Sequence, residues 1–387
     1  MAVSRLRHIP GIGVDRMGNA ANAAADPDML RLENLDTDIR PPVAALAATR
    51  AAIDVDESNS YLPFLGQQHL RQAAAARVSQ AAGQVYDWQD QCVITAGGLS
   101  GILNALLAMI ETGDEVIITD PAYAGLLNRI RLAGGIPRLV PLVPTASCWR
   151  LDCDALMQSQ TDRTRVVLTM SPSMPSGIVH DAEEWAAIAD VAVRTGAFVL
   201  HDAAMERILY TDETAIHPAR LPGLADRVVT VGSVSKEYRM IGWRVGWVVG
   251  PKPIMADIGL VGLTNVVCQV GIGMAGAAAA LTTKEDGIAE AVATWRARRD
   301  RILDELSDLP VLTPYGGWSM LIDTEALGMA PTDASRRLFD TGRIAATPMT
   351  GWGDAARAGR YLRFVFAKEP VERLSGIRER IRAAWSV

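Results

Sequence analysis

The chain has 387 residues, of which 49% are hydrophobic and 21% are charged, with a formal net charge of −6. This composition is typical of a soluble globular protein whose core is large enough for two or three lobes. The mild acidity argues against a protein that binds nucleic acid, because no block of Lys and Arg forms a local exception.

The N-terminal sequence predicts a protein that is not exported. The first forty residues contain no continuous apolar core of the signal-peptide type. Four cysteines form no CxxC pair and no metal-type spacing with the five histidines, which is typical of reduced cysteines in a cytoplasmic protein; they are Cys92, Cys148, Cys153 and Cys268. The longest apolar run, residues 266–281, has 16 residues and includes a glutamine, so it is too short for a membrane span.

Strands and helices alternate from about residue 45 to residue 281. The β-rich runs are CVITAG, EVIIT, RVVLTM, AFVLHD, RVVTVGS and VGWVVG, at residues 92–97, 115–119, 165–170, 197–202, 227–233 and 245–250. Helical stretches such as residues 100–110 and 181–195 separate most of them, and Asp181 with Glu184 forms a capping-box pattern at the start of the second stretch. This alternation predicts an α/β fold with a mostly parallel, doubly wound sheet covered on both faces.

The apolar run contains Gly271-x-Gly273-x-x-Gly276, which has the form of a dinucleotide fingerprint. The chain continues as an alanine-rich helix instead of reaching a second strand with an acidic residue. We therefore expect these glycines to allow close helix packing and not to bind a nucleotide.

The C-terminal part predicts a smaller α+β lobe. TWRARRDRILDEL, residues 294–306, has the pattern of one long connecting helix, and strands are expected within residues 316–325 and 360–367. We expect a large domain at residues 45–285 and a small domain made of residues 1–44 and 286–387.

Polar residues follow three predicted strands, at the edge where such sheets bind ligands. After Thr95, Gly97 and Gly98 allow a tight turn, and a helix beginning near Leu99 would present free N–H groups to an anion. Asp202 ends the run AFVLHD, where its carboxylate could pair with a protonated ring nitrogen or simply cap a loop.

The third group lies in GSVSKEYRMIGWR, residues 232–244, which places two hydroxyls, an amine and a guanidinium close together in the sequence. A lysine at the end of a buried strand must find a partner or lose its proton. An amine for a Schiff base, an anion site and a carboxylate for a pyridine nitrogen together describe a site for pyridoxal 5′-phosphate.

The segment SVSKEYRMIGWRVG resembles the lysine motif of the class I/II aminotransferases, the fold-type-I pyridoxal phosphate enzymes. SYLPFLGQQHLR, ETGDEVIITDPAYAG, PSGIV and YLRFVFA stand in the order expected for that family. The resemblance extends from about residue 32 to residue 367. It implies the aminotransferase fold, with the large domain as the cofactor-binding domain.

The resemblance also implies roles for individual residues. Lys236 would form the Schiff base and carry the proton between the substrate Cα and the cofactor, Asp202 would pair with the pyridinium, and Tyr123 would stack on the ring. The phosphate would be held by Gly98 and Leu99 through backbone N–H groups, and by Ser233, Ser235 and Arg244.

Two further residues are implied at the edges of the site. Tyr61 would reach the phosphate of a neighbouring subunit, which implies a homodimer with shared active sites. Arg363 would bind the α-carboxylate of an amino-acid substrate through two hydrogen bonds, although an isolated arginine in a strand is more often a surface residue.

The sequence departs from the family pattern at two positions beside the cofactor. SPSMPSG places Met174 where the family has an asparagine, and DAAMER places Met205 where it has a tyrosine. In the family both side chains donate to the phenolic oxygen of the cofactor, whereas a thioether cannot donate. The alternative is a slipped alignment, in which other hydroxyls supply the donors: Ser171, Ser173 or Tyr210.

Three classes of function fit these motifs. The first, which we predict because it is the commonest activity in the family, is an aminotransferase acting on an α-amino acid through a Cα carbanion. The second is elimination, γ-replacement or carbon–carbon bond formation on a γ-activated amino acid such as S-adenosylmethionine, which the paired methionines favour. The third, a non-catalytic ligand-sensing domain, is disfavoured because no basic helix-turn-helix segment is visible. RLENLDTDIRPP, residues 31–42, lacks the glycine of the family's substrate-covering loop, so the substrate side chain is not predicted.

Overall fold

The computed structural model describes residues 3, 6–145, 147–212 and 214–385. Its central element is an eight-stranded sheet with the strand order β2-β9-β8-β7-β6-β3-β4-β5. The strands are β2 (Cys92–Thr95), β3 (Glu115–Asp120), β4 (Ile136–Pro144), β5 (Trp149–Leu151), β6 (Thr164–Met170), β7 (Phe198–Asp202), β8 (Val228–Ser233) and β9 (Gly246–Val249). Strands β8, β7, β6, β3 and β4 pair in parallel, whereas β9 is antiparallel to both its neighbours. The predicted mostly parallel sheet is confirmed.

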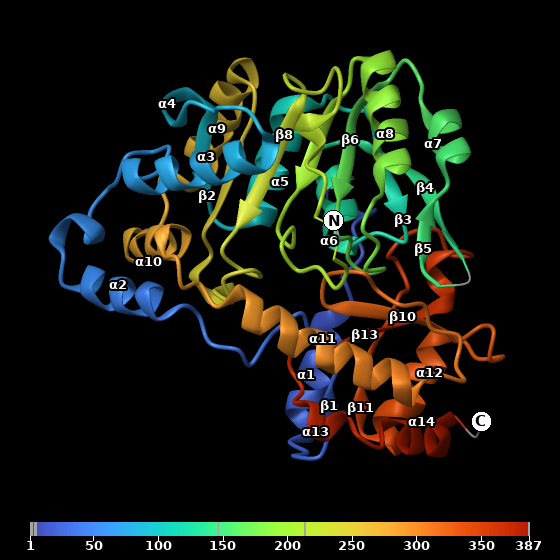
Figure 1. Ribbon diagram of the computed structural model, residues 1–387. Helices are drawn as coiled ribbons and strands as arrows, with labels where there is room; N and C mark the ends of the chain where they lie inside the picture. The colour runs from blue at the N-terminus through green and yellow to red at the C-terminus, as the bar shows by residue number, and fades with distance from the viewer. Residues whose placement is uncertain (1–2, 4–5, 146, 213, 386–387) are drawn as a thin grey trace.

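Helices cover both faces of this sheet (Figure 1). Successive strand side chains point to opposite faces, so neighbours such as Ile117 and Ile118 belong to two separate hydrophobic clusters. One cluster includes residues of α5 (Gly98–Met109), α6 (Ala124–Leu132) and α9 (Lys252–Val266). The other includes residues of α3 (Gln68–Ala82), α7 (Cys153–Ser159) and α8 (Ala182–Thr195). The sheet is therefore buried on both sides, as the apolar strand runs predict.

Helix α8 begins with the capping box that the sequence predicts. The backbone N–H of Glu184 donates to the Asp181 carboxylate at 2.9 Å, and the backbone N–H of Asp181 donates to the Glu184 carboxylate at 3.0 Å. Two N–H groups at the helix start are thereby satisfied. The helix ends at Gly196, whose φ of 71° is in the left-handed region.

The glycine-rich run forms helix α10 (Gly271–Thr282), which packs against α2 (Val43–Ile53). A Cβ on Gly276 would collide with the Thr49 side chain and lie 3.1 Å from the carbonyl oxygen of Ala45. Close helix packing, and not a nucleotide loop, explains these glycines, as predicted. Figure 1 shows α2 and α10 together at one side of the molecule. Within the described chain, no helix is both long and apolar enough to cross a membrane.

The C-terminal lobe is built on a small antiparallel sheet with the order β10-β13-β12. Its strands are β10 (Ser319–Asp323), β12 (Thr347–Pro348) and β13 (Tyr361–Val365), and the long helix α11 (Ile288–Glu305) leads into it (Figure 1). The other elements of this part are α12 (Pro331–Arg337), α13 (Val371–Leu374) and α14 (Ile377–Trp385).

The N-terminal segment joins this lobe. Strand β1 (Leu30–Arg31) pairs in parallel with β11 (Ile344–Ala345), and α1 (Val14–Ala24) contacts β11. A short helix, α4 (Trp88–Gln91), precedes β2 in the large sheet. The division of the chain at residues 45 and 285 stays a prediction.

Candidate active site

A cavity of about 220 Å³ lies beyond the carboxyl ends of β7 and β8. It brings together most of the residues that the sequence assigns to a cofactor site: Gly98, Leu99, Tyr123, Met174, Asp202, Met205, Ser233, Ser235, Lys236 and Arg244. Tyr61 and Arg363 do not line it. Since β7 and β8 are parallel neighbours, their polar ends meet at one edge of the sheet.

Asp202 is the last residue of β7, and its side chain is buried. Burial raises the pKa of its carboxyl to about 6, although Arg129 and Lys236 oppose this shift. One carboxylate oxygen accepts a hydrogen bond from the backbone N–H of Ala204 at 3.1 Å. A buried carboxylate with so few partners would be stabilised by a cationic ligand, as the protonated nitrogen of a pyridine ring is.

Lys236 follows the end of β8 and projects its amine into the cavity. Burial lowers the pKa of this amine to about 8. The Nζ atom donates to the carbonyl oxygen of Leu35 at 3.0 Å and lies 4.9 Å from the ring centroid of Trp318. A lowered pKa provides free base near neutral pH, which a lysine needs in order to attack a carbonyl group.

The start of α5 forms an anion cradle with the residues after β8. A Cβ on Gly97 would lie 2.5 Å from Nη2 of Arg244, and one on Gly98 would lie 3.5 Å from the Cβ of Ser233. Arg244 also donates to the Ser235 hydroxyl at 3.5 Å. Backbone N–H groups at a helix start, two hydroxyls and a guanidinium are the donors that a phosphate group prefers. The residues present therefore fit pyridoxal 5′-phosphate.

Gly246 holds this cradle in place. It is the first residue of β9 and pairs with Ser233. A Cβ at this position would lie 2.6 Å from the carbonyl carbon of Gly97 and 2.6 Å from the backbone nitrogen of Gly98. Those atoms are backbone and cannot move aside, so the glycine allows β9 to approach the turn before α5.

An aromatic wall borders the cavity near α6. Tyr123 precedes α6, and burial raises the pKa of its phenol. Its ring centroid lies 5.5 Å from that of Trp352, which comes from the C-terminal lobe. Both lobes thus contribute rings near the cavity.

Met174 and Met205 line the cavity, and their exposed fractions are only 3% and 1%. The residues that a slipped alignment would use as donors, Ser171, Ser173 and Tyr210, do not line the cavity. The Ser171 hydroxyl accepts from the backbone N–H of His180 at 3.0 Å, and the Tyr210 hydroxyl donates to the carbonyl of Gly317 at 2.6 Å. The two thioethers therefore stand in the wall of the cavity.

Arg363 lies in β13 and is completely buried, so it is not a surface residue. Burial lowers the pKa of its guanidinium to about 10. It donates to the carbonyl of Glu33 and to the Met174 sulfur, the latter at 3.6 Å, and its Cζ lies 4.6 Å from the Trp352 ring centroid. Its Nε has no hydrogen-bond partner among the described residues. A buried guanidinium with a free donor is suited to bind a carboxylate.

Tyr61 lies between η2 (Asp56–Asn59) and α3, and its exposed fraction is 83%. Its side chain takes no part in the cavity of its own chain. Within one chain, the structure therefore separates Tyr61 from the other predicted site residues.

Sequence reasoning missed several residues near the site. Leu35 lines the cavity. From the C-terminal lobe, Trp318 contacts Lys236, and Trp352 contacts Tyr123 and Arg363. The entry segment RLENLDTDIRPP was a signal for Leu35, because it resembles a substrate-covering loop. No spacing in the sequence identifies the two tryptophans, since their proximity arises from the packing of the lobes.

Comparisons with known proteins agree with this geometry. The model of the family "Aminotransferase class I and II" matches residues 31–381. A probable N-succinyldiaminopimelate aminotransferase from Mycobacterium tuberculosis is 32% identical over 342 residues, which cover 83% of this chain and 86% of that protein. An aspartate aminotransferase from Streptomyces avermitilis is 30% identical over 384 residues, with 95% and 91% of the two chains covered. The solved structure of N-succinyldiaminopimelate aminotransferase from Mycobacterium tuberculosis superposes with a TM-score of 0.92 at 30% identity, covering 99% of this chain and 100% of that one.

Replacing Gly246 by Ala should weaken pyridoxal phosphate binding roughly tenfold and lower the free energy of unfolding by about 1–3 kcal/mol, because the new methyl group overlaps backbone atoms of the cradle. Fluorescence titration and urea unfolding measure the two effects. Gly242→Ala is the matched control, since a Cβ there meets nothing within 4 Å. Equal affinities for the two variants would show that the close approach of β9 is not needed.

Proposed function

This chain belongs to the class I and II aminotransferase family and is a pyridoxal phosphate-dependent aminotransferase, and from that premise we propose that it removes the amino group of an α-amino acid by means of the Lys236 amine. The observation that carries this proposal is the meeting of that amine, the Asp202 carboxylate and an anion cradle in one cavity. The relatives are named for different substrates, N-succinyldiaminopimelate and aspartate. We therefore propose the substrate class and leave its side chain open.

We propose that the cradle holds the cofactor at its phosphate. Bound pyridoxal phosphate supplies a conjugated ring that takes up the electron pair left when the substrate Cα loses its proton. The backbone N–H groups of Gly98 and Leu99 would bind phosphate oxygens, together with Ser233, Ser235 and Arg244. Asp202 would accept a hydrogen bond from the ring nitrogen and keep it protonated, and Tyr123 would cover the ring.

Lys236 would act first as nucleophile and then as base. At pH 7 about a tenth of its amine is unprotonated, far more than for an exposed lysine, because burial lowers the pKa to about 8. The free amine of Lys236 would accept the proton of the substrate Cα on its lone pair and hold it for a later return. Arg363 would hold the substrate carboxylate through two parallel N–H donors and so orient the Cα–H bond.

We also propose a homodimer with shared active sites. Its first support is Tyr61, which is exposed on its own chain but has a role in the cofactor site by resemblance. Its second support is a set of exposed apolar side chains in α2, before α3, in α9 and before α10: Val43, Ile53, Phe64, Leu260 and Val270. Exposed apolar groups of this kind are typical of a surface that another chain covers.

We also propose a cellular compartment and a division of the chain into domains. The four cysteines are unpaired, which supports a reducing compartment, and we propose the cytoplasm. We also propose that residues 45–285 form the cofactor-binding domain, because the residues lining the cavity come mainly from that range.

Replacing Lys236 by Ala should strongly slow the transfer of an amino group from an amino acid to the cofactor. Holoenzyme mixed with a panel of α-amino acids, without a keto acid, should convert its cofactor to the amine form and release one equivalent of keto acid. The variant should lose at least roughly a hundredfold in this rate, because the nucleophile and base is gone. Lys252→Ala removes an exposed lysine paired with Asp90 and should retain the wild-type rate.

Stopped-flow absorbance and product analysis follow this reaction. Undiminished turnover by Lys236→Ala would contradict the proposed role of that residue. A released leaving group in place of a keto acid would show that the substrate carbanion is diverted to elimination or replacement.

Met205→Tyr should shift the pH dependence of the cofactor spectrum. The resemblance places a donor to the phenolic oxygen at this position, and the thioether provides none. An added hydroxyl would stabilise the charge on that oxygen, so the pH midpoint of the visible absorption change should fall by roughly one unit. Met205→Phe adds a ring without the hydroxyl and should leave the midpoint unchanged. A shared midpoint for the Tyr and Phe variants would rule out the missing donor as its cause.

Two measurements test the dimer: the mass of the protein in solution and the effect of replacing Tyr61 by Phe. Sedimentation should give twice the chain mass of 41.5 kDa for both the wild type and the variant. The variant should bind pyridoxal phosphate roughly tenfold more weakly, because a hydroxyl that donates to a charged phosphate is lost. Tyr86→Phe is the control, since that hydroxyl contacts Gln84 outside the cavity. A monomer with full activity would contradict shared sites.

A further inference from the structure

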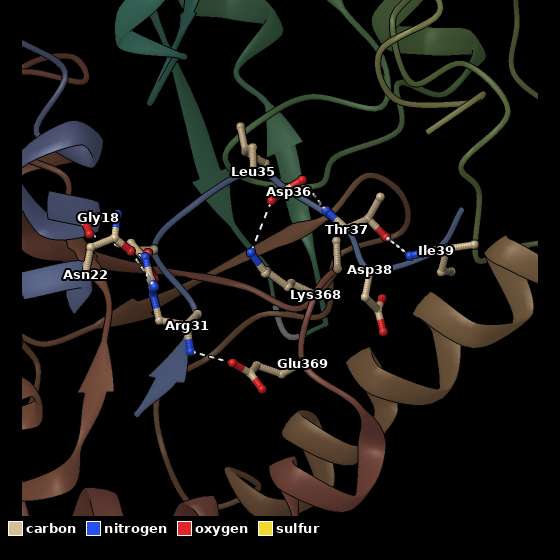
Figure 2. Close-up of polar contacts among 12 residues, drawn as sticks. Gly18, Asn22, Arg31, Leu35, Asp36, Thr37, Asp38, Ile39, Lys368 and Glu369 are labelled. Carbon is tan, nitrogen blue, oxygen red and sulfur yellow. Dashed lines mark hydrogen bonds and ion pairs between the residues drawn. The ribbon is translucent and has the colours of Figure 1, made fainter. Parts of the chain in front are cut away.

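The segment at residues 33–38, which we call the strap, passes over the amine of Lys236. Three side-chain contacts anchor it to the C-terminal part of the chain. The Asp36 carboxylate pairs with Lys368 at 3.1 Å, as Figure 2 shows. The Asp38 carboxylate accepts from both Nη atoms of Arg298, at 2.8 and 2.9 Å. The Thr37 hydroxyl accepts from the indole N–H of Trp295 at 3.3 Å.

The backbone of the strap also accepts hydrogen bonds from two cationic side chains, Arg363 and Lys236. The carbonyl of Glu33 accepts from Arg363, and the carbonyl of Leu35 accepts from Nζ of Lys236 at 3.0 Å. Asp36 is the next residue along the chain, so the peptide that contacts the amine also carries a carboxylate.

Four charged side chains act on the Lys236 amine. After burial, Asp36 has the largest influence, and it favours the protonated amine. Arg244 and Arg363 disfavour the protonated form, while Asp202 favours it. Asp36 and Arg363 lie outside the cavity lining, and the Asp36 carboxylate pairs with the cationic side chain of Lys368.

We propose that the charges of the Asp36–Lys368 ion pair, which the strap places near Lys236, set how much of the Lys236 amine is available as base. Asp36 holds a proton on the nitrogen, and Lys368 limits that effect by neutralising part of the carboxylate charge. Neither residue of the pair takes part in the chemical step, because the Lys236 lone pair still takes the proton from the substrate Cα. The inference rests on the proposed role of Lys236. Both side chains of the pair are about 40% exposed, so solvent screening keeps the effect modest.

The test uses the pH dependence with which the full-length chain, freed of cofactor, takes up pyridoxal phosphate covalently, followed by absorbance. Its midpoint reports the ionisation of the Lys236 amine. Asp36→Asn should move the midpoint down, and Lys368→Gln should move it up, each by roughly half a pH unit. Asp38→Asn also loosens the strap, but Asp38 is not among the main influences on the amine, so this variant should shift the midpoint much less than Asp36→Asn does. Lys368→Arg keeps the charge and should behave as the wild type.

The opposite signs separate this proposal from a purely structural role of the strap. If the pair only anchored the segment, Asp36→Asn and Lys368→Gln would shift the midpoint in the same direction, as would Asp38→Asn, and the proposal would be overturned. Unchanged midpoints for Asp36→Asn and Lys368→Gln would overturn it as well. Failure of the underlying function is distinguishable, because the wild type itself would then take up no cofactor covalently, or Lys236→Ala would take it up equally well.

Discussion

Burying the Lys236 amine and the Asp202 carboxylate at neighbouring strand ends costs free energy, because each ion loses much of its hydration. The rest of the site compensates for only part of that cost, since Asp36 and Asp202 favour the protonated amine whereas Arg244 and Arg363 disfavour it. Burial lowers the pKa of the amine and raises the pKa of the carboxyl, so both groups titrate closer to neutrality than they would in water. The strap, Arg244 and Arg363 then act on groups whose protonation is already finely balanced. A site built on this balance responds to small changes in nearby charge.

The large sheet and the polar ends of its strands could be predicted because their signals are local. Apolar runs of strand length, glycines at turns and the Asp181 capping box each follow from a few neighbouring residues. Strand β4 was missed for an equally local reason, since its sequence IPRLVPLVP contains Pro137, Pro141 and Pro144, and proline argues against a paired strand. The structure places this strand between β3 and β5.

The contribution of the C-terminal lobe to the site could not be predicted in the same way. Trp318 reaches Lys236, and Trp352 reaches Tyr123, only because the two lobes pack together. The Leu35 carbonyl is a backbone group, so no residue type signals its contact with the amine. Met174 and Met205 were identified because a family pattern made their identity unexpected, and the structure adds that both are buried in the cavity wall.

The pairing of β1 with β11 connects residues that are more than three hundred positions apart in the chain. During synthesis, the ribosome completes the whole large sheet before it produces the strand that β1 pairs with. The N-terminal segment, including the strap, therefore lacks its partner strand until after the large sheet has been synthesised. Arg363 and Lys368 emerge later still, so both are added after the residues of the proposed phosphate cradle. Order of synthesis thus separates the proposed phosphate cradle from the arginine proposed to bind the substrate.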